Sequence, residues 1–347
     1  MQVAQRSTSE TGKGADAGYF TVDRMYYFEN GTTDVRFTQS QSTDVPTGEG
    51  FAKSLKFDCT TADASLASDN QLVLKYRIEG QDIQQLKWGT SSAEKITLSF
   101  YIKSTKTGTF IVELSRESRK ISQAYTVSSS DTWEKKTLTF DADTGGSVIT
   151  NDSSNRLEIN YYMGVGTNYS SGTLDTAWTG GTNANRAVGQ VNAFDNTSNN
   201  ILFTGLQLEV GSQATPFEHR SFGEELQLCR RYFWAMVPEG EATGAAGDAG
   251  QYVMGSGYYL GTGQVELPLV FNQEMRAAPT LEVSSGTNHF VIEAAGGNDY
   301  FNTWAIFSAK KQSALLYGTS NVSGTAGQSG RIVATSTSSY VYWSAEL

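Results

Sequence analysis

Few residues in this chain could perform acid–base, nucleophilic or metal chemistry. Its 347 residues include two histidines, His219 and His289, and two cysteines, Cys59 and Cys229. Neither histidine has a partner at the C-x-x-C or H-x-x-x-H spacing that is typical of zinc sites. A Ser-His-Asp triad would have to use one of these two imidazoles. We therefore expect no metal, no cofactor and two free, buried cysteines, with a single disulfide bridge as the alternative.

Carboxylates are abundant, but few are paired in a way that suggests catalysis. A glycosidase needs two carboxyl groups held about 5 to 9 Å apart. The candidate pairs are Asp141 with Asp143, and Glu239 with Glu241. Both pairs fall in turns or linkers, where acidic side chains usually form a solvated surface. The sequence therefore predicts a protein that is not an enzyme, and a polysaccharide depolymerase is a less favoured alternative.

One long polar segment, residues 168–200, has a composition that suits sugar binding. Sugar sites combine an aromatic ring, which covers the C–H face of a pyranose, with polar groups for its hydroxyls. We expect this segment to be an extended loop with at most one short strand. Its candidate contact residues are Tyr169, Trp178 and Arg186, with Asp175, Asn183 and Asn185, and the turn-like stretch "QLKWGTSS" adds Trp88. Alternatively, Trp178 packs under its own loop and Trp88 caps the core.

Aromatic residues beside glycines and polar turns form a second set of candidates near the end of the chain. They occur in "GSGYYLGTG" and "GGNDYFNTW". The candidate receptor-contacting residues are Tyr258, Tyr259, Tyr300, Phe301 and Trp304. Ordinary packing between strands is the alternative for about half of them.

Charge and hydropathy exclude two classes of partner. The net charge is −10 and the isoelectric point is about 4.8, so a phosphate backbone would be repelled and nucleic acid is not expected as a partner. No stretch approaches the ~20 apolar residues of a membrane-spanning helix. Residues 1–18 lack the apolar core of a signal peptide, so we expect synthesis in a cytoplasm, with a removed export signal as the alternative.

The elements that must position these residues are mostly strands. Apolar residues alternate with polar ones in "QLVLKYRIE", "ITLSFYIK", "TFIVELS", "RLEINYYMG" and "LFTGLQLEV". Turn-forming segments such as "ENGTTD" and "DADTGGS" separate these runs. Short, half-buried strands of this kind predict an all-β fold, with an antiparallel sandwich or jelly roll in the first part of the chain.

A single helix interrupts this β pattern. Ser221 and Glu224 form a capping-box pattern, and we expect a helix over residues 221–236. Phe222, Leu226, Cys229 and Phe233 recur at helical spacing and predict one apolar face. That face could dock on the first domain or pack against copies of itself. After it, "GQVELPLVF", "HFVIEA" and "YVYWSAEL" indicate a second, smaller β-sandwich.

The stretch "FTGLQLEVGSQATPFEHRSFGEELQLCRRYF" resembles a segment common in bacteriophage tail fibre proteins. Those proteins carry a run close to Q-L-E-x-G-x-x-A-T-P-F-E-x-R, followed by G-x-E-L-x-L-C-x-R-Y. The first run is matched from Gln207 to Arg220 and the second from Gly223 to Tyr232. The opening "GYFTVDRMYYFENG" and the later "QEMRAAPT" are similar to further segments of such fibres.

This resemblance implies a domain organisation and a function. It implies a carbohydrate-binding-module-like jelly roll at 1–220, a connecting and trimerisation helix at 221–236, and a C-terminal head at 237–347. It also implies a virion protein, a homotrimer that contacts other tail proteins and attaches to a host-surface glycan. A structural virion component, such as a capsid fibre or adaptor, is the alternative. Sugar-binding jelly rolls often hold calcium through an aspartate on the last strand, but Thr204 and Gly205 occupy that region here, so no calcium is expected.

Overall fold

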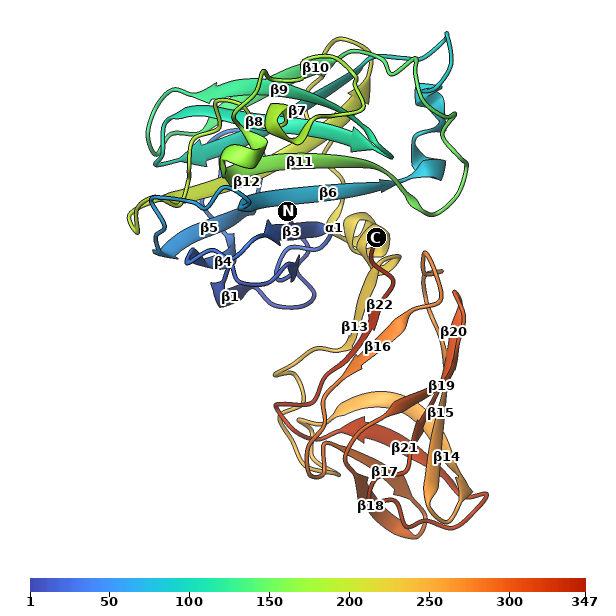
Figure 1. Cartoon of the computed structure of the whole chain (residues 1–347). Coiled ribbons are helices and arrows are strands. Elements are labelled where there is room, and N and C mark those ends of the chain that lie inside the picture. The colour runs from blue at the N-terminus through green and yellow to red at the C-terminus, as the bar shows by residue number, and fades with distance from the viewer. The chain divides into compact units, whose positions relative to one another are not determined.

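The computed structural model describes all residues from 1 to 347. The chain divides into two compact units, residues 1–222 together with Leu347, and residues 223–346 (Figure 1). Each unit is built almost entirely from antiparallel strands, and the chain contains one α-helix. The prediction of an all-β fold with a single short helix is therefore confirmed.

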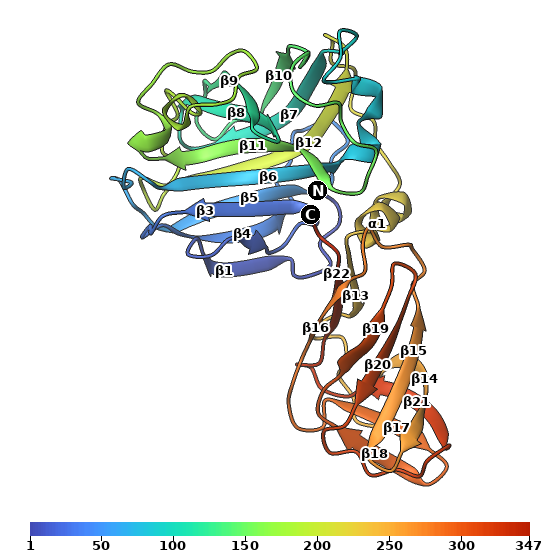
Figure 2. The same cartoon turned by 45° about the vertical axis from the view of Figure 1, so that its right-hand side comes forward.

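Unit 1 is a sandwich of two six-stranded antiparallel sheets. In spatial order, sheet A contains β1 (Ser9–Lys13), β4 (Arg36–Ser42), β5 (Ser54–Thr61), β12 (Asn200–Val210), β7 (Ile96–Ser104) and β10 (Glu134–Phe140). Sheet B contains β2 (Gly18–Tyr19), β3 (Met25–Asn30), β6 (Gln71–Glu79), β11 (Asn155–Val165), β8 (Gly108–Arg116) and β9 (Arg119–Val127). Figure 2 shows β3, β6 and β11 lying side by side in sheet B.

The core between the sheets is formed by the alternating apolar residues of the strands. Leu98 and Phe100 of β7 and Leu72 and Leu74 of β6 all belong to one buried cluster. Aromatic rings make up much of this cluster, and Phe37 alone contacts the rings of Tyr27, Phe57 and Phe194 at centroid distances of 4.9, 5.2 and 5.5 Å. The period of two that is visible in the sequence thus corresponds to the inward face of each sheet.

The outward face of β7 is also buried, which the alternation did not predict. Thr97, Ser99 and Tyr101 are 0%, 3% and 8% exposed. The hydroxyl of Thr97 donates to the carbonyl of Gly211, and that of Tyr101 donates to Glu49. The rings of Phe51 and Tyr101 lie 5.4 Å apart. Irregular segments therefore cover this part of the outward face of sheet A. The alternation within one strand does not reveal contacts with segments that are distant in the sequence.

The segment that follows β12 is held by the outward side chains of that strand. The amide oxygen of Gln207 accepts a bond from the backbone nitrogen of Glu218, and the carboxylate of Glu209 accepts from the hydroxyl of Thr215. This return places the ring of Phe217 4.9 Å from that of Phe51. The "QLEVGSQATPFE" stretch thus folds back on its own strand as it leaves the sandwich.

A bulge in β12 explains the glycine in the middle of that strand. The pairing of β12 with β7 shifts between Thr204 and Gln207, and Gly205 has a φ of +61°. A side chain at Gly205 would lie 2.5 Å from the ring of Phe51. Glycine is required here both for the left-handed backbone and for the close approach of that ring.

Short 3-10 helices occur in the connections of unit 1. Two of them, η1 (Gly80–Asp82) and η2 (Gln84–Leu86), follow β6. The other two, η3 (Thr167–Tyr169) and η4 (Asn183–Asn185), lie in the long polar segment, which has no strand of its own and only one isolated β-bridge, between Lys120 and Thr179. The expectation of an extended loop over 168–200 is confirmed.

The α-helix is shorter than predicted. It spans α1 (Phe222–Arg230), and the chain then enters β13 (Phe233–Val237). Phe233 is therefore not on the helix: it is fully buried, pairs with Ser344 and lies 5.4 Å from the ring of Tyr342. The predicted face Phe222–Leu226–Cys229–Phe233 is wrong at its last member, because "FWAMV" satisfies its backbone in a sheet.

Unit 2 contains two antiparallel sheets. The three-stranded sheet C contains β13, β22 (Val341–Ser344) and β16 (Thr280–Val283). The seven-stranded sheet D contains β18 (Gly297–Phe301), β17 (Phe290–Ala294), β21 (Ser329–Ala334), β14 (Tyr252–Gly261), β15 (Gln264–Val270), β20 (Ser313–Gly318) and β19 (Ala305–Ala309). Trp343 of sheet C and Leu267, Phe290 and Leu316 of sheet D share one buried cluster. No helix in the chain is long and apolar enough to cross a bilayer.

Candidate functional site

The outward face of sheet B carries polar and aromatic side chains in register across neighbouring strands. One row runs from Tyr26 on β3 through Lys75 on β6 to Asn160 on β11. In the next row Arg77 is opposite Glu158. Phe28 lies on the same face of β3 as Tyr26, since residues two apart on a strand share a face. We call Tyr26, Phe28, Lys75, Arg77 and Glu158 the sheet B strip.

The strip is organised around the carboxylate of Glu158. Its two oxygens contact Lys75 Nζ at 3.3 Å and Arg77 Nε at 3.0 Å, and Asn155 donates to it at 2.9 Å. The same two cations lie over aromatic rings: Lys75 is 4.0 Å from the ring centroid of Phe28, and Arg77 is 4.1 Å from that of Tyr26. These contacts hold five side chains in fixed positions on one face of the sheet, which is the preorganisation that a ligand surface needs.

Electrostatics keeps the strip charged. Burial alone would raise the pKa of Glu158, but the charges and hydrogen bonds of Lys75 and Arg77 outweigh it and hold the pKa below its ordinary value. Burial lowers the pKa of Lys75 more than Glu158 raises it. Two cations thus face one carboxylate. The side chains remain 12%, 18% and 19% exposed for Lys75, Arg77 and Glu158, so solvent reaches all three.

The long loop forms one border of this face. Its backbone pairs with the edge strand β9, where the nitrogen of Ser122 donates to Asp175 and that of Lys120 donates to Thr179. From there Arg186 reaches back over the sheet and forms a bidentate pair with Glu113, at 2.8 and 2.7 Å. Glu113 is fully buried and also accepts from Asn160 at 3.1 Å. Arg186 was predicted as a ligand contact, and the structure gives it this anchoring role.

The other predicted residues of the loop are held by the protein itself. Tyr169 is half-buried and accepts a hydrogen bond from Asn30. Asn185 bonds Asp175 at 3.0 Å, which closes the loop on itself, and Asn183 is exposed. Trp178 is half-buried, donates to the carbonyl of Asp141, and lies 5.0 Å from the ring of Trp88 in an edge-to-face arrangement.

The prediction that Trp88 contacts a sugar is wrong. Its side chain has no exposed surface, and its indole nitrogen donates to the carbonyl of Glu94 at 2.7 Å. The ring therefore cannot stack on a ligand, and the alternative of a core-capping tryptophan is the one observed. The polar surroundings "QLKWGTSS" misled the prediction because the turn folds over its own tryptophan.

The aromatic candidates of unit 2 divide between core and surface. Phe301, Trp304 and Tyr259 are 0%, 3% and 3% exposed and belong to the buried cluster, so their prediction as receptor contacts is wrong. The hydroxyl of Tyr259 donates to Asp299. Tyr300 on β18 and Tyr258 on β14 are half-buried, and Tyr258 donates to Glu266 at 2.5 Å.

Of the two acidic pairs, one makes structural contacts and the other is exposed. Asp143 is fully buried between Arg116 and Arg119, whereas Asp141 is exposed and pairs with Lys95 at 2.7 Å. Glu239 and Glu241 are exposed. Both cysteines are free and buried, as expected. No group of three or more His, Cys, Asp or Glu side chains is arranged to hold a metal ion.

The sheet B strip was not predicted, because the candidate residues of the sequence were chosen in and beside turn-like, Gly-rich and polar segments. The signal was present in the strands: the non-core positions of "QLVLKYRIE" are Lys75 and Arg77, and Glu158 occupies such a position in "RLEINYYMG". What the sequence lacked was the strand pairing that places these three side chains opposite one another.

Comparisons with known proteins give distant similarities of fold. No family model and no curated protein matches the chain. Among solved structures, the enzymatically active domain of tailspike protein 4 of bacteriophage CBA120 is similar over 54% of this chain, with 13% identity and a TM-score of 0.30. The match spans only 19% of that tailspike chain.

Two carbohydrate-binding modules are similar at the same level. A family 11 module from Clostridium thermocellum, solved with a β-1,3-1,4-mixed-linked tetrasaccharide, matches 60% of this chain and 99% of its own, with 10% identity and a TM-score of 0.29. The tandem CBM22-1–CBM22-2 domain of Xyn10C from Paenibacillus barcinonensis matches 92% of this chain and 93% of its own, with 10% identity and a TM-score of 0.26. Similarities of this size assign neither a ligand nor a reaction to the chain.

Proposed function

We propose that this protein is a phage tail fibre or receptor-binding protein that attaches a virion to a glycan on the host surface without catalysis. In this proposal it is made in the bacterial cytoplasm, is incorporated into the virion and contacts other tail proteins. The resemblance of residues 203–233 to tail fibre sequences supports the class of protein. The sheet B strip supports the class of ligand.

The observation that carries the glycan proposal is the geometry of the strip. Sugar hydroxyls need planar, charged or amide groups that are already oriented, and pyranose C–H faces need aromatic surface beside them. Glu158, Lys75 and Asn155 supply the polar groups, and Tyr26 and Phe28 supply the rings. A flat face of a sheet also accepts an extended polymer, which suits a surface polysaccharide better than a small metabolite.

Binding of the full chain to cells of candidate hosts, with soluble glycans as competitors, tests this proposal. Glu158→Gln should weaken competable binding about tenfold, because it removes charge-assisted hydrogen bonds from the strip. Glu94→Gln is the matched control, since the side chain of Glu94 is 43% exposed and pairs only with Lys87. Unchanged binding by Glu158→Gln would reject the strip as the site. A folded protein that binds no host would favour a structural virion component.

The proposal includes a homotrimer. Phe222 and Leu228 of α1 are 55% and 50% exposed, which is unusual for large apolar side chains on a nine-residue helix. We expect sedimentation at micromolar concentration to give about three times the chain mass of 37.7 kDa. Phe222→Asp should lower that mass, whereas Val210→Asp, at a position that is 47% exposed on β12, should not. A monomeric wild-type protein would contradict the trimer.

A further inference from the structure

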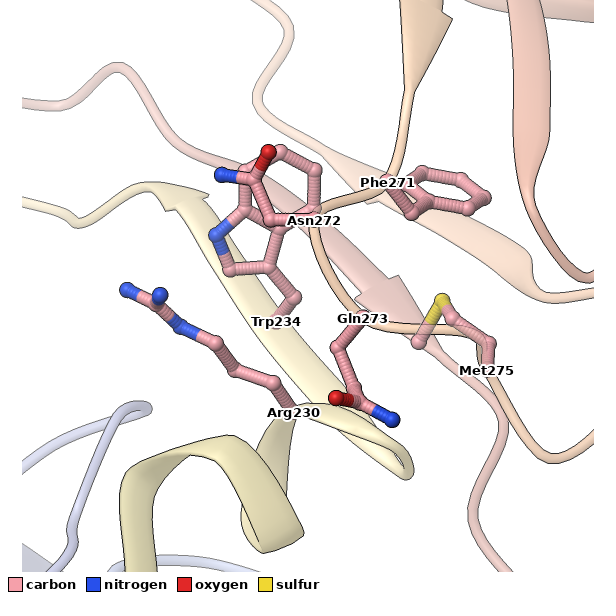
Figure 3. A pocket seen from close by; sticks show the side chains of 6 residues that line it. All are labelled: Arg230, Trp234, Phe271, Asn272, Gln273 and Met275. Atoms are coloured by element: carbon pink, nitrogen blue, oxygen red, sulfur yellow. The ribbon is translucent and has the colours of Figure 1, made fainter. Parts of the chain in front are cut away.

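A hollow in unit 2 is too small for an organic ligand. Figure 3 shows the side chains that line it, which are Arg230, Trp234, Phe271, Asn272, Gln273 and Met275. The space that they leave between them admits about one water molecule. This hollow therefore holds no sugar, and an open face of a sheet is the better place for a further ligand.

The outward face of sheet A carries a tryptophan that does not pack on the core. Trp133 directly precedes β10 and is half-buried. Unlike Trp88 and Trp178, it belongs neither to the buried cluster of unit 1 nor to the side chains that pack against that cluster. Because β10 is antiparallel to β7, the strand register places Trp133 beside Lys103. Part of the indole surface is thus exposed to solvent on this face.

A network of charged side chains holds the edge of this indole. Its nitrogen donates to one oxygen of Asp44 at 2.9 Å. The other oxygen of Asp44 lies 2.9 Å from the ammonium of Lys103, which also contacts Asp131 at 3.0 Å. The side chain of Lys103 is only 15% exposed, whereas those of Asp44 and Asp131 are 44% and 64% exposed. We call Asp44, Lys103, Asp131 and Trp133 the sheet A cluster.

The acidic members of the cluster come from separate, anchored segments. Asp44 follows β4, and its backbone carbonyl accepts a bond from the hydroxyl of Ser54 at 2.6 Å. Asp131 lies between β9 and β10, and its backbone nitrogen donates to Ser104 of β7 at 2.9 Å. Burial alone would raise the pKa of Asp44, but the hydrogen bonds that it accepts within the cluster outweigh burial and hold the pKa below its ordinary value. This carboxylate is therefore charged at neutral pH.

The residue types of the cluster select a class of ligand. An indole face covers the C–H side of a pyranose, and carboxylate oxygens accept hydrogen bonds from its hydroxyls. Lys103 already lies between the two carboxylates, so it would repel a second ammonium group. The carboxylates of Asp44 and Asp131 outnumber this cation and would repel an acidic sugar. The cluster therefore suits an uncharged sugar.

We propose that the sheet A cluster binds an uncharged pyranose unit, whose C–H face lies on Trp133 and whose hydroxyls donate to Asp44 and Asp131. The two sheets of unit 1 share one core between them, so this face is on the opposite side of the sandwich from the sheet B strip. In the strip two cations face one carboxylate, whereas here two carboxylates face one cation. The proposal does not rest on the strip or on the tail fibre assignment.

Saturation-transfer NMR of the full chain with single sugars tests the assignment. Glucose, galactose, mannose and N-acetylglucosamine are the uncharged probes, and glucuronate and glucosamine are the charged ones. At least one uncharged sugar should bind with a Kd below about 100 mM, and both charged sugars should bind at least about threefold more weakly than it does. An oligosaccharide of the sugar that binds best distinguishes a polymer from the free sugar as the source, and tighter binding of either names that source.

Variants assign the binding to the cluster. Trp133→Ala should weaken binding of the best uncharged sugar at least about tenfold, because it removes the surface for the C–H face. Asp131→Asn should weaken it about threefold and should reduce the preference over glucuronate. Asparagine tolerates the left-handed backbone at Asp131, whose φ is +53°. Asp16→Asn is the matched control: Asp16 is exposed between β1 and β2, and this variant should bind as the wild type does.

Several results would overturn the proposal. One is that no uncharged sugar binds with a Kd below about 100 mM, and another is that a charged sugar binds as tightly as the best uncharged one. Unchanged binding by the folded Trp133→Ala would place the sugar elsewhere on the chain. If Trp133→Ala does not fold, unchanged binding by Asp131→Asn rejects the cluster, because this substitution at an exposed side chain leaves the contact between Trp133 and Asp44 in place.

Discussion

Replacement of Arg186 by methionine is expected to lower the free energy of unfolding of unit 1 by about 3–5 kcal/mol. Glu113 is fully buried, and Arg186 is the only cation that pairs with it in the structure. The substitution keeps much of the apolar stem but leaves a buried carboxylate whose remaining side-chain partner is Asn160. Urea denaturation, with hydrogen exchange of β8 and β11 peptides to localise the change, measures this effect.

The matched control for that substitution is Arg156→Met. Arg156 pairs with Asp152 four residues away, at side-chain exposures of 29% and 32%. Solvent-exposed pairs of this kind contribute little to stability, so this variant should be nearly as stable as the wild type. Adding Glu113→Gln to Arg186→Met should restore part of the loss, because no buried charge then remains. Equal losses of unfolding free energy in Arg186→Met and Arg156→Met would show that the buried pair contributes no more to stability than the exposed one.

Loss of Arg186 should also release the loop that borders the sheet B strip. The side chain ties the loop to β8 at Arg186, while backbone bonds of Asp175 and Thr179 hold another part of the loop at the β9 edge. Those edge bonds survive the substitution. We therefore expect faster exchange near Arg186 than near Thr179, which links the stability of the pair to the shape of the candidate site.

The strands of unit 1 were predictable because their signal is local. The five alternating runs in the first part of the sequence correspond to β6, β7, β8, β11 and β12. Apolar residues recur at every second position of a half-buried strand. Each strand can therefore be recognised from its own sequence, without knowing which strands pair with it. The helix was found for the same reason, but its end was misplaced, since Phe233 also fits a helical period and only sheet pairing decides against it.

The candidate sites were harder to predict because they depend on which strands pair and on which side chains become buried in the folded chain. Trp88, Phe301 and Trp304 lie near glycines and polar residues in the sequence, yet each side chain is at most 3% exposed in the structure. Conversely, Lys75 and Glu158 are 83 residues apart and meet through strand register alone.

A second buried charge network holds the long loop in place at Trp178. The carboxylate of Asp143 accepts from Arg116 at 2.8 Å and from Arg119 at 2.9 Å, and its backbone carbonyl accepts from Gly89. Arg119 also donates to the carbonyl of Trp178. One residue thus connects the β8–β9 turn, the segment that carries Trp88 and the long loop.

Replacement of Asp143 by alanine is therefore expected to destabilise unit 1 by about 3–5 kcal/mol, because Arg116, whose side chain is 1% exposed, loses its counter-charge inside the protein. Asp141→Ala, two residues earlier, should change stability by less than about 1 kcal/mol, since its pair with Lys95 is 67% and 55% exposed. Urea denaturation followed by tryptophan fluorescence reports both variants, because Trp88 and Trp178 lie beside the network. Adding Arg116→Met to Asp143→Ala should recover stability if the uncompensated charge is the cause. If the double variant instead loses as much unfolding free energy as the sum of the losses of Asp143→Ala and Arg116→Met alone, the loss is due to packing.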